Sequence, residues 1–118
     1  MVMHGGDDGD LKDYGFPDDY IFNWNCKDLQ KLDAGNGERI PLLSEVFELI
    51  HSTNVFVNIE LKGPRTPSLS AIYNCELAAN RVLETVNQYD MHGRFLISSF
   101  NHDDLLLEMH KARQIYLS

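Results

Sequence analysis

Long apolar runs and clusters of basic residues are both missing from this sequence. No apolar run approaches the roughly 20 residues that a membrane-spanning helix needs, and residues 1–8 lack the charged and apolar regions of a signal peptide. Lys and Arg number 10 against 18 Asp and Glu, which gives a net charge of -8. We therefore expect no transmembrane segment, no nucleic-acid partner and no anionic membrane surface as partner, with the cytoplasm as the default location.

Cysteine is scarce as well. Cys26 and Cys75 are the two cysteines, and they lie far apart and outside any CxxC spacing. Two reduced thiols are therefore expected rather than a disulfide or a metal site. The 118 residues are 43% hydrophobic and 24% charged, which is ordinary for one globular domain with a single core.

Residues 55–62, VFVNIELK, are the most informative part of the chain. In a strand, alternate side chains point to opposite faces, so the valines, Ile59 and Leu61 form an apolar face. The other face runs from Phe56 and Asn58 to Glu60 and Lys62. This pattern is typical of a parallel strand covered by helices on one side, with its polar residues near the carboxyl end. An ordinary amphipathic strand with a surface ion pair is the alternative.

Helix and strand patterns alternate along the rest of the chain. The expected elements are the end of a strand at 1–3, a loop at 13–24, a short helix capped by Asn25 and ended by Gly35 and Gly37, a helix from about Pro41 to Ile50, the strand at 55–62, a helix at about 68–88, a strand at 95–100, a helix capped by Asn101, and the start of a strand at 115–118. Tyr14, Phe16, Tyr20, Phe22 and Trp24 are expected to anchor the loop.

Such alternation builds a parallel sheet with helical crossovers. An open doubly wound sheet could be complete at this length, whereas a (β/α)₈ barrel needs about 250 residues. Periodicity alone favours the open sheet. However, the chain starts on a strand and ends as another begins, so both ends look cut, and this favours part of a barrel.

Several segments together resemble the glycerophosphodiester phosphodiesterase family. They are His4 at the end of a strand, LQKLDAG at 29–35, ERIPLLSEV at 38–46, NIELK at 58–62 and ISSF at 97–100. Their order and spacing extend over nearly the whole chain. The resemblance implies a single partial (β/α)₈ TIM-barrel domain over residues 1–118, covering the third to sixth strands of the family barrel. It further implies a hydrolase that cleaves glycerophosphodiesters to glycerol phosphate and an alcohol.

The resemblance also implies roles for three residues. Glu60 matches the metal-binding glutamate of the family, which usually uses a divalent cation such as Ca²⁺ or Mg²⁺. Lys62 matches the lysine that contacts the substrate phosphate. His4 matches the second catalytic histidine, proposed there as general acid toward the leaving alkoxide. The sequence departs from the family here, because Gly5 and an acidic glycine-rich stretch follow His4 where the family usually has Asp.

The family's first two strands, with a His-Arg pair and a Glu-x-Asp metal pair, have no counterpart in these 118 residues. One carboxylate does not make a Mg²⁺ or Ca²⁺ site, so we expect the isolated chain to be catalytically poor. The alternative is a non-catalytic α/β interaction module that associates with another half-barrel, or with itself, through open sheet edges. Ser98 and Ser99 lack the glycines of a nucleophile elbow and are expected to pack against the next helix.

Overall fold

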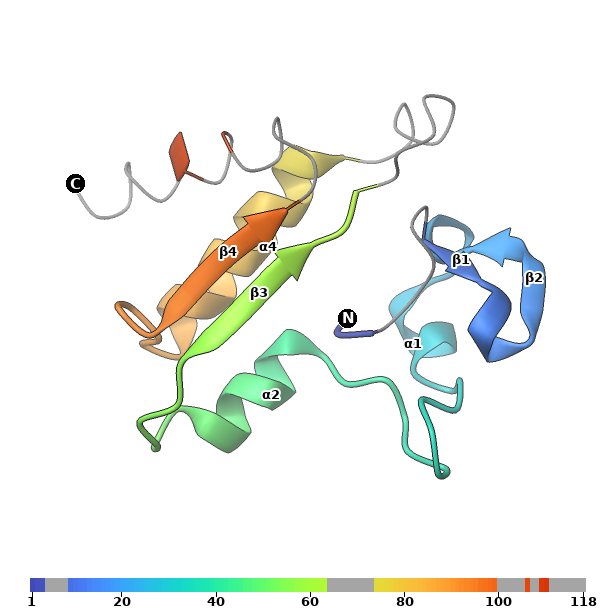
Figure 1. Cartoon of the computed structure of the whole chain (residues 1–118), viewed down its shortest axis with the longest axis horizontal. Helices are drawn as coiled ribbons and strands as arrows, with labels where there is room; N and C mark the ends of the chain where they lie inside the picture. The colour runs from blue at the N-terminus through green and yellow to red at the C-terminus, as the bar shows by residue number, and fades with distance from the viewer. Residues whose placement is uncertain (4–8, 64–73, 100–105, 107–108, 111–118) are drawn as a thin grey trace.

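A computed structural model describes residues 1–3, 9–63, 74–99, 106 and 109–110 (Figure 1). The elements in chain order are β1 (Asp10–Leu11), a 3₁₀ turn (Lys12–Tyr14), β2 (Phe16–Tyr20), a second 3₁₀ turn (Ile21–Asn23), α1 (Cys26–Leu29), α2 (Leu43–Ile50), β3 (Val57–Leu61), α4 (Cys75–Gln88) and β4 (Phe95–Ser99). They form two regions, which we call the hairpin lobe (residues 9–42) and the βα layer (residues 43–63 and 74–99).

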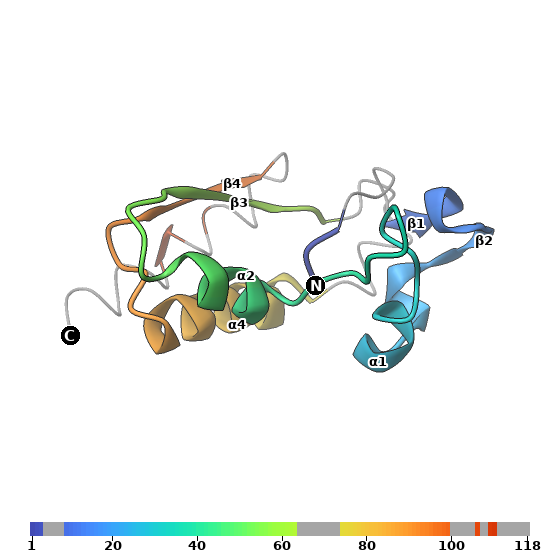
Figure 2. The same ribbon diagram turned by 90° about the horizontal axis from the view of Figure 1, so that it is seen from below.

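The βα layer is built on a parallel strand pair. β3 and β4 pair in register from Val57 opposite Phe95 to Leu61 opposite Ser99. Both α2 and α4 lie on one face of this pair, as Figure 2 shows. The predicted parallel strands with a helix between them are therefore confirmed, and the described residues form an α/β fold that fits part of a barrel.

β3 is shorter than the predicted strand at 55–62. Its pairing starts where the Val57 N–H donates to the carbonyl of Arg94, at 3.0 Å. Val55 and Phe56 precede this bond and are 47% and 73% exposed. Within the strand the predicted alternation is confirmed, because Ile59 and Leu61 are buried while Asn58 and Glu60 are exposed.

The core of the layer lies between the strands and the two helices. Its buried members are Phe47, Ile59, Val86 and Met91, and partly buried apolar side chains of α2, β3, α4 and β4 pack around them. Phe47 from α2 and Tyr89 at the end of α4 make an edge-to-face contact with ring centres 6.2 Å apart. Phe47 of α2 and its partly buried neighbours thus meet α4 against one face of the sheet. Leu49, which the three- and four-residue spacing placed on the apolar face of this helix, is instead 78% exposed.

Polar caps fix the helix starts. The Glu45 carboxylate accepts a hydrogen bond from the Leu42 N–H at 2.8 Å at the start of α2. The Asn74 side chain accepts one from the Leu77 N–H at 2.9 Å at the start of α4. The predicted end of α4 at about Gln88 is confirmed, whereas the part predicted at 68–73 lies outside the described residues.

Two predictions for the ends of the chain have different outcomes. The strand expected at 1–3 is wrong, since these residues are not in a strand, although the Val2 N–H donates to the carbonyl of Pro41 at 2.8 Å. Leu106, Met109 and His110 are helical, in agreement with the helix expected after Asn101. Asn101 itself and the strand expected at 115–118 lie outside the described residues.

The loop predicted at 13–24 is also wrong, because β2 occupies its centre. β2 pairs antiparallel with β1, with Asp10 opposite Tyr20 and Leu11 opposite Phe16. Gly15 makes the tight turn with a φ of 88°, a conformation that glycine adopts without strain. Leu11 in β1 is fully buried, and β2 pairs with this strand although Gly15, Pro17 and the lack of a helical period indicated a loop.

The short helix α1 begins as predicted but ends early. The Asn25 side chain accepts the Asp28 N–H at 2.9 Å, which confirms the cap. The helix ends at Leu29 rather than continuing through Leu32. Beyond it, the Asp33 carboxylate accepts the N–H groups of Gly35 and Gly37 at 2.8 and 3.0 Å and so makes a turn of its own.

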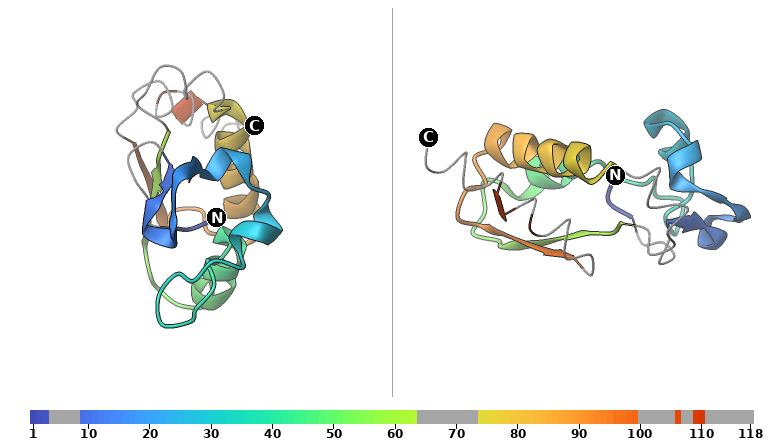
Figure 3. Two further views of the ribbon diagram at one scale, coloured as in Figure 1. Left: turned by 90° about the vertical axis from the view of Figure 1, so that its right-hand side faces the viewer. Right: turned by 90° about the horizontal axis from the view of Figure 1, so that it is seen from above.

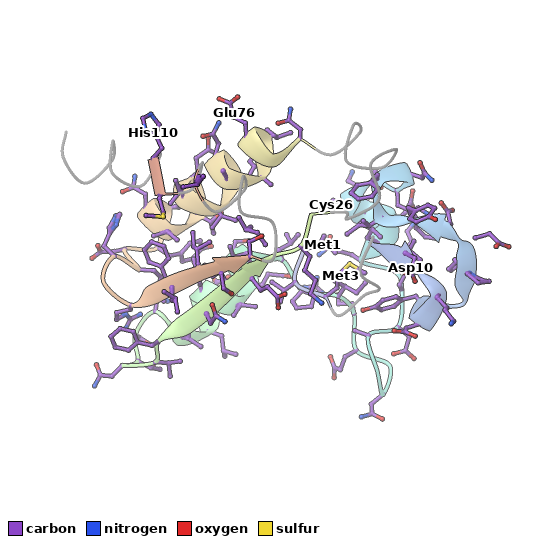
Figure 4. The ribbon with its side chains drawn as sticks, turned by 45° about the horizontal axis from the view of Figure 1, so that its top comes forward. Met1, Met3, Asp10, Cys26, Glu76 and His110 are labelled. Atoms are coloured by element: carbon purple, nitrogen blue, oxygen red, sulfur yellow. The ribbon has the colours of Figure 1, made fainter. Side chains whose placement is uncertain are left out.

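The hairpin lobe lies beyond the end of the βα layer toward which β3 and β4 run (Figures 1 and 3). Residues 1–3 run toward it, and the Met1 and Cys26 sulfur atoms lie 3.3 Å apart (Figure 4). Cys26 is an exposed, free cysteine, as expected. Among the described residues, no helix has both the length and the apolar character required to cross a bilayer.

Candidate functional site

The candidate site lies on the face of β3 that the helices leave uncovered. Glu60 is the fourth residue of β3 and is exposed, between the buried Ile59 and Leu61. Lys62 follows directly after the strand and is exposed as well. Alternation therefore separates the charged residues from the core, and it brings Glu60 and Lys62 to the carboxyl end of the strand.

Two further polar residues belong to this face. In the strand register Ser98 lies opposite Glu60, and its hydroxyl donates to the Asn58 amide oxygen at 3.0 Å. Sequence reasoning expected Ser98 to pack against the next helix, most of which lies outside the described residues. Phe95 and Ile97 pack on the core, so the residues between and beyond them alternate to the open face. The period of two in residues 95–99 (FLISS) predicts that Ser98 lies on the open face.

Ser99 has a different partner. Its hydroxyl donates to the backbone carbonyl of Leu61 at 2.9 Å, across the ends of the two strands. This bond ties the last paired positions of β3 and β4 together immediately before Lys62. It therefore holds the strand ends from which the charged side chains of the site extend.

The two charges of the site are not neutralised by each other. Within the described ranges the ion pairs join Lys31 to Asp28, Arg39 to Glu45 and Arg81 to Glu84, and none involves Glu60 or Lys62. A solvated carboxylate and a solvated ammonium, two residues apart at one strand end, can contact a cation and an anion respectively.

The described residues do not form a complete metal site. In the ranges that the structure covers, no group of three or more His, Cys, Asp or Glu side chains lies close enough to hold an ion. Glu60 has the hard oxygen ligand that Ca²⁺ and Mg²⁺ prefer, but a single carboxylate does not retain either ion. His4, the predicted general acid, lies outside the described residues.

Comparison with known proteins gives the family. The sequence profile of the "Glycerophosphoryl diester phosphodiesterase family" matches residues 1–116, which is nearly the whole chain. The match includes the polar face of β3 and both regions of the structure. It agrees with the resemblance drawn from the sequence motifs.

Individual relatives agree with the family match. A protein of Caldanaerobacter subterraneus subsp. tengcongensis, named glycerophosphodiester phosphodiesterase, is 36% identical over 93 residues, which cover 73% of this chain and 35% of that protein. A protein of the same name from Bacillus altitudinis is 38% identical over 69 residues, which cover 58% of this chain and 25% of that protein. The chain thus spans about a third or less of the length of these relatives. It belongs to the glycerophosphoryl diester phosphodiesterase family.

Proposed function

We propose that this chain forms part of the active site of a phosphoric diester hydrolase that cleaves glycerophosphodiesters to glycerol phosphate and an alcohol. The observation that carries the proposal is the pair of exposed charges, Glu60 and Lys62, at the carboxyl end of β3 in a member of this family. Active sites of parallel α/β barrels lie at that end of the strands. The relatives named as phosphodiesterases favour this function over a non-catalytic interaction module.

Glu60 is proposed as a ligand of a divalent cation. The family resemblance assigns it this role, and its exposed carboxylate on the open face of β3 supports the assignment. Because the described residues offer one carboxylate at this place, the remaining ligands must come from elsewhere in the complete site. Glu60 alone is not expected to bind the cation measurably.

Lys62 is proposed to bind the substrate phosphate, and His4 to donate a proton to the leaving alkoxide. An ammonium forms charge-assisted hydrogen bonds with phosphoryl oxygens, and these strengthen as negative charge develops there. A histidine titrates near neutral pH and can supply the proton that the leaving group needs. Both roles come from the family resemblance, and the exposure of Lys62 beside Glu60 supports the first.

We also propose that residues 1–118 correspond to the third to sixth strands of a (β/α)₈ barrel, with β3 and β4 as two adjacent parallel strands, although residues 1–3 are not in a strand in this structure. The helices α2 and α4 cover one face of the strands, as on the outside of a barrel, and the open face has the polar residues expected inside. Among the described residues β3 and β4 pair only with each other, so each keeps one edge for a further strand.

A chimera tests the proposed roles. The aligned segment of the Caldanaerobacter relative is replaced by this chain, and hydrolysis of glycerophosphocholine is measured with Mg²⁺ or Ca²⁺. We expect Glu60→Gln to lower kcat/KM by at least about 100-fold, or roughly 3 kcal/mol of transition-state stabilisation. Glu48→Gln, the same change at an exposed position of α2, serves as the matched control and should leave the rate unchanged. Equal rates for the two variants would contradict the proposal.

The 118-residue chain by itself gives a second test. We expect hydrolysis of glycerophosphocholine at the background rate, because positioning and charge stabilisation need groups that these residues do not supply together. Metal-dependent turnover by the purified chain, lost in Glu60→Gln, would show that these residues form a complete site. Sedimentation of the same sample measures self-association, and a second copy that completes a site through the strand edges would appear as a dimer.

A further inference from the structure

The hairpin lobe has a hollow of about 430 Å³ on its surface, where β2 and α1 meet. This volume lies within the roughly 300–1,000 Å³ range of small-molecule sites. Phe16, Trp24 and Leu32 form its apolar part, and Asn23, Asn25, Asp28 and Lys31 form its polar part. None of these residues has a role in the proposed phosphodiesterase site, so the inference below does not rest on that function.

The aromatic part of the hollow is held in place by the protein. The Trp24 indole N–H donates to the Asp19 carboxylate at 2.8 Å, which fixes the ring by its edge. Phe16 meets Trp24 edge to face, with ring centres 4.7 Å apart and an interplanar angle of 68°. Phe16 is still 40% exposed. The lobe therefore presents aromatic surface whose geometry is set before a ligand arrives, which lowers the cost of binding.

The polar part mixes donors with acceptors. The Asp28 carboxylate accepts the Lys31 ammonium at 2.9 Å and the Asn25 amide at 2.7 Å. Lys31 has three ammonium protons and uses one in this bond, and its side chain is 76% exposed. Asn23 donates its amide to Asp19 at 2.9 Å, and its amide oxygen can still accept. Donors and acceptors thus lie together beside an aromatic surface.

Charge narrows the class of ligand. Lys31 lies beside Asp28 and its bond holds the pKa of that carboxyl below its usual value, so the pair is ionised at neutral pH and its charges cancel. A quaternary ammonium would meet the Lys31 charge and a free phosphate would meet the Asp28 charge. A neutral ring with several hydroxyl groups avoids both penalties. Its C–H face can lie on the negative face of an aromatic ring while its hydroxyl groups bond to the polar part.

We propose that this hollow binds a neutral polyhydroxylated ring, a saccharide or a cyclitol. Trp24 provides the aromatic surface together with Phe16. Lys31, Asn23 and Asn25 supply bonds to ring hydroxyl groups. Sequence reasoning treated these aromatic residues as loop anchors, because the strand that brings Phe16 to Trp24 was not foreseen.

The single tryptophan of the chain reports directly on this site. Trp24 emission is measured while the 118-residue chain is titrated with myo-inositol, glucose and galactose, and separately with choline and inorganic phosphate. We expect a saturable change with at least one of the three neutral ligands, half-complete on the order of 1 mM, at the weak end of specific binding. A change with choline or phosphate alone, or with none of the five, would overturn the proposal.

Variants locate the binding within the lobe. Lys31→Ala is expected to raise the half-saturating concentration at least fivefold, since it removes donors and leaves the aromatic rings intact. Lys27→Ala, at an exposed position of α1 that does not line the hollow, is the matched control and should bind as the wild type does. Equal affinities for the two variants would contradict the site.

A measurement on the wild-type chain keeps the test independent of any variant's folding. In heteronuclear NMR spectra the ligand should shift the Trp24 indole signal and the side-chain amide signals of Asn23 and Asn25. The amide signals of Asn87, in α4 of the other region, should stay in place. Shifts confined to the βα layer would place the ligand elsewhere and overturn the proposal.

Discussion

The βα layer and the hairpin lobe keep their shapes by different means. The layer has a shared core in which Phe47, Val86 and Met91 are at most 1% exposed, and it comes from long elements with regular apolar spacing. The lobe has elements of two to five residues, and its turns depend on side chains such as Asp19, Asn25 and Asp33 bonding to nearby groups. Periodicity thus defines one region, whereas local polar bonds and a few buried side chains, Leu11, Leu29 and Ile40, define the other.

The two proposed sites divide along the same line. The regular region supplies Glu60 and Lys62 from a strand end fixed by parallel pairing. The irregular region supplies a hollow whose residues come from β2, the second 3₁₀ turn, α1 and the residues that flank this helix. Sites of the first kind can be predicted from a strand pattern, whereas sites of the second kind depend on turns that only the folded chain reveals.

Phe47→Ala should have the largest effect on stability. It removes a fully buried ring from the core of the βα layer, and such truncations cost about 3–5 kcal/mol. Urea unfolding is followed by far-UV circular dichroism, dominated by α2 and α4, and in parallel by Trp24 emission from the lobe. If the two regions are separately stabilised, the dichroism midpoint falls much further than the emission midpoint.

Leu49→Ala is the matched control for this experiment. Leu49 belongs to the same helix but is 78% exposed, so its truncation should change stability by less than about 0.5 kcal/mol. Equal shifts of both midpoints in Phe47→Ala would mean that the two regions unfold as one unit. That outcome would contradict the claim that the βα layer and the hairpin lobe are stabilised separately.

Arg94→Met should have an intermediate effect, also confined to the layer. The Arg94 guanidinium donates to the carbonyl of His51 at 3.0 Å and to that of Thr53, and so ties the end of α2 to the start of β4. Loss of these charged hydrogen bonds should cost about 1–3 kcal/mol, measured by urea unfolding. Arg81→Met removes an exposed pair with Glu84 and should cost less than about 0.5 kcal/mol. Similar losses in both variants would show that Arg94 is not a link between elements.

The smallest effect on stability is expected when low pH protonates Asp19 in the hairpin lobe. Hydrogen bonds from the Asn23 amide, the Trp24 indole and the Tyr20 N–H hold the pKa of Asp19 below its usual value of 3.8. Because the pKa is lowered on folding, this carboxylate stabilises the lobe fully above about pH 4, and the contribution is lost as the pH falls through the lowered pKa. Trp24 emission should therefore change below pH 3.8, and Asp19→Asn should abolish that change.

Asp18→Asn, at the preceding position of β2, is the control for this titration. It should leave the acid transition of Trp24 in place. A transition that persists in Asp19→Asn, or one that is centred above pH 4, would show that another group controls the lobe.

The βα layer could be predicted well from the sequence. The period of two in 57–61 and the three- and four-residue spacing in 42–50 gave β3, α2 and the burial of Ile59 and Leu61. The ends of β3 were misplaced, because pairing with β4 decides where a strand begins, and a sequence shows no pairing. Glu60 and Lys62 were proposed as site residues because their charges interrupt an apolar strand.

The hairpin lobe could not be predicted in the same way. β2 lacks the alternation of a half-buried strand, since Phe16, Pro17 and Asp18 are all exposed. It was recognised only from its pairing with β1, where Leu11 is buried. The end of α1 depends on a turn made by the Asp33 carboxylate, which competes with the helix for backbone groups. The bond from the Ser98 hydroxyl to the Asn58 amide oxygen was not foreseen either, because a sequence does not show which residues lie on neighbouring strands.

The roles of Glu60 and Lys62 are the central claim, and the metal dependence of the chimera tests them most directly. Initial rates of glycerophosphocholine hydrolysis are measured against Mg²⁺ concentration for Glu60→Gln and Lys62→Gln. We expect Glu60→Gln to raise the half-saturating Mg²⁺ concentration at least about 10-fold, as loss of a ligand should. Lys62→Gln should lower kcat/KM for the diester and leave the Mg²⁺ dependence unchanged. The same Mg²⁺ dependence in Glu60→Gln as in the unmutated chimera would contradict the account.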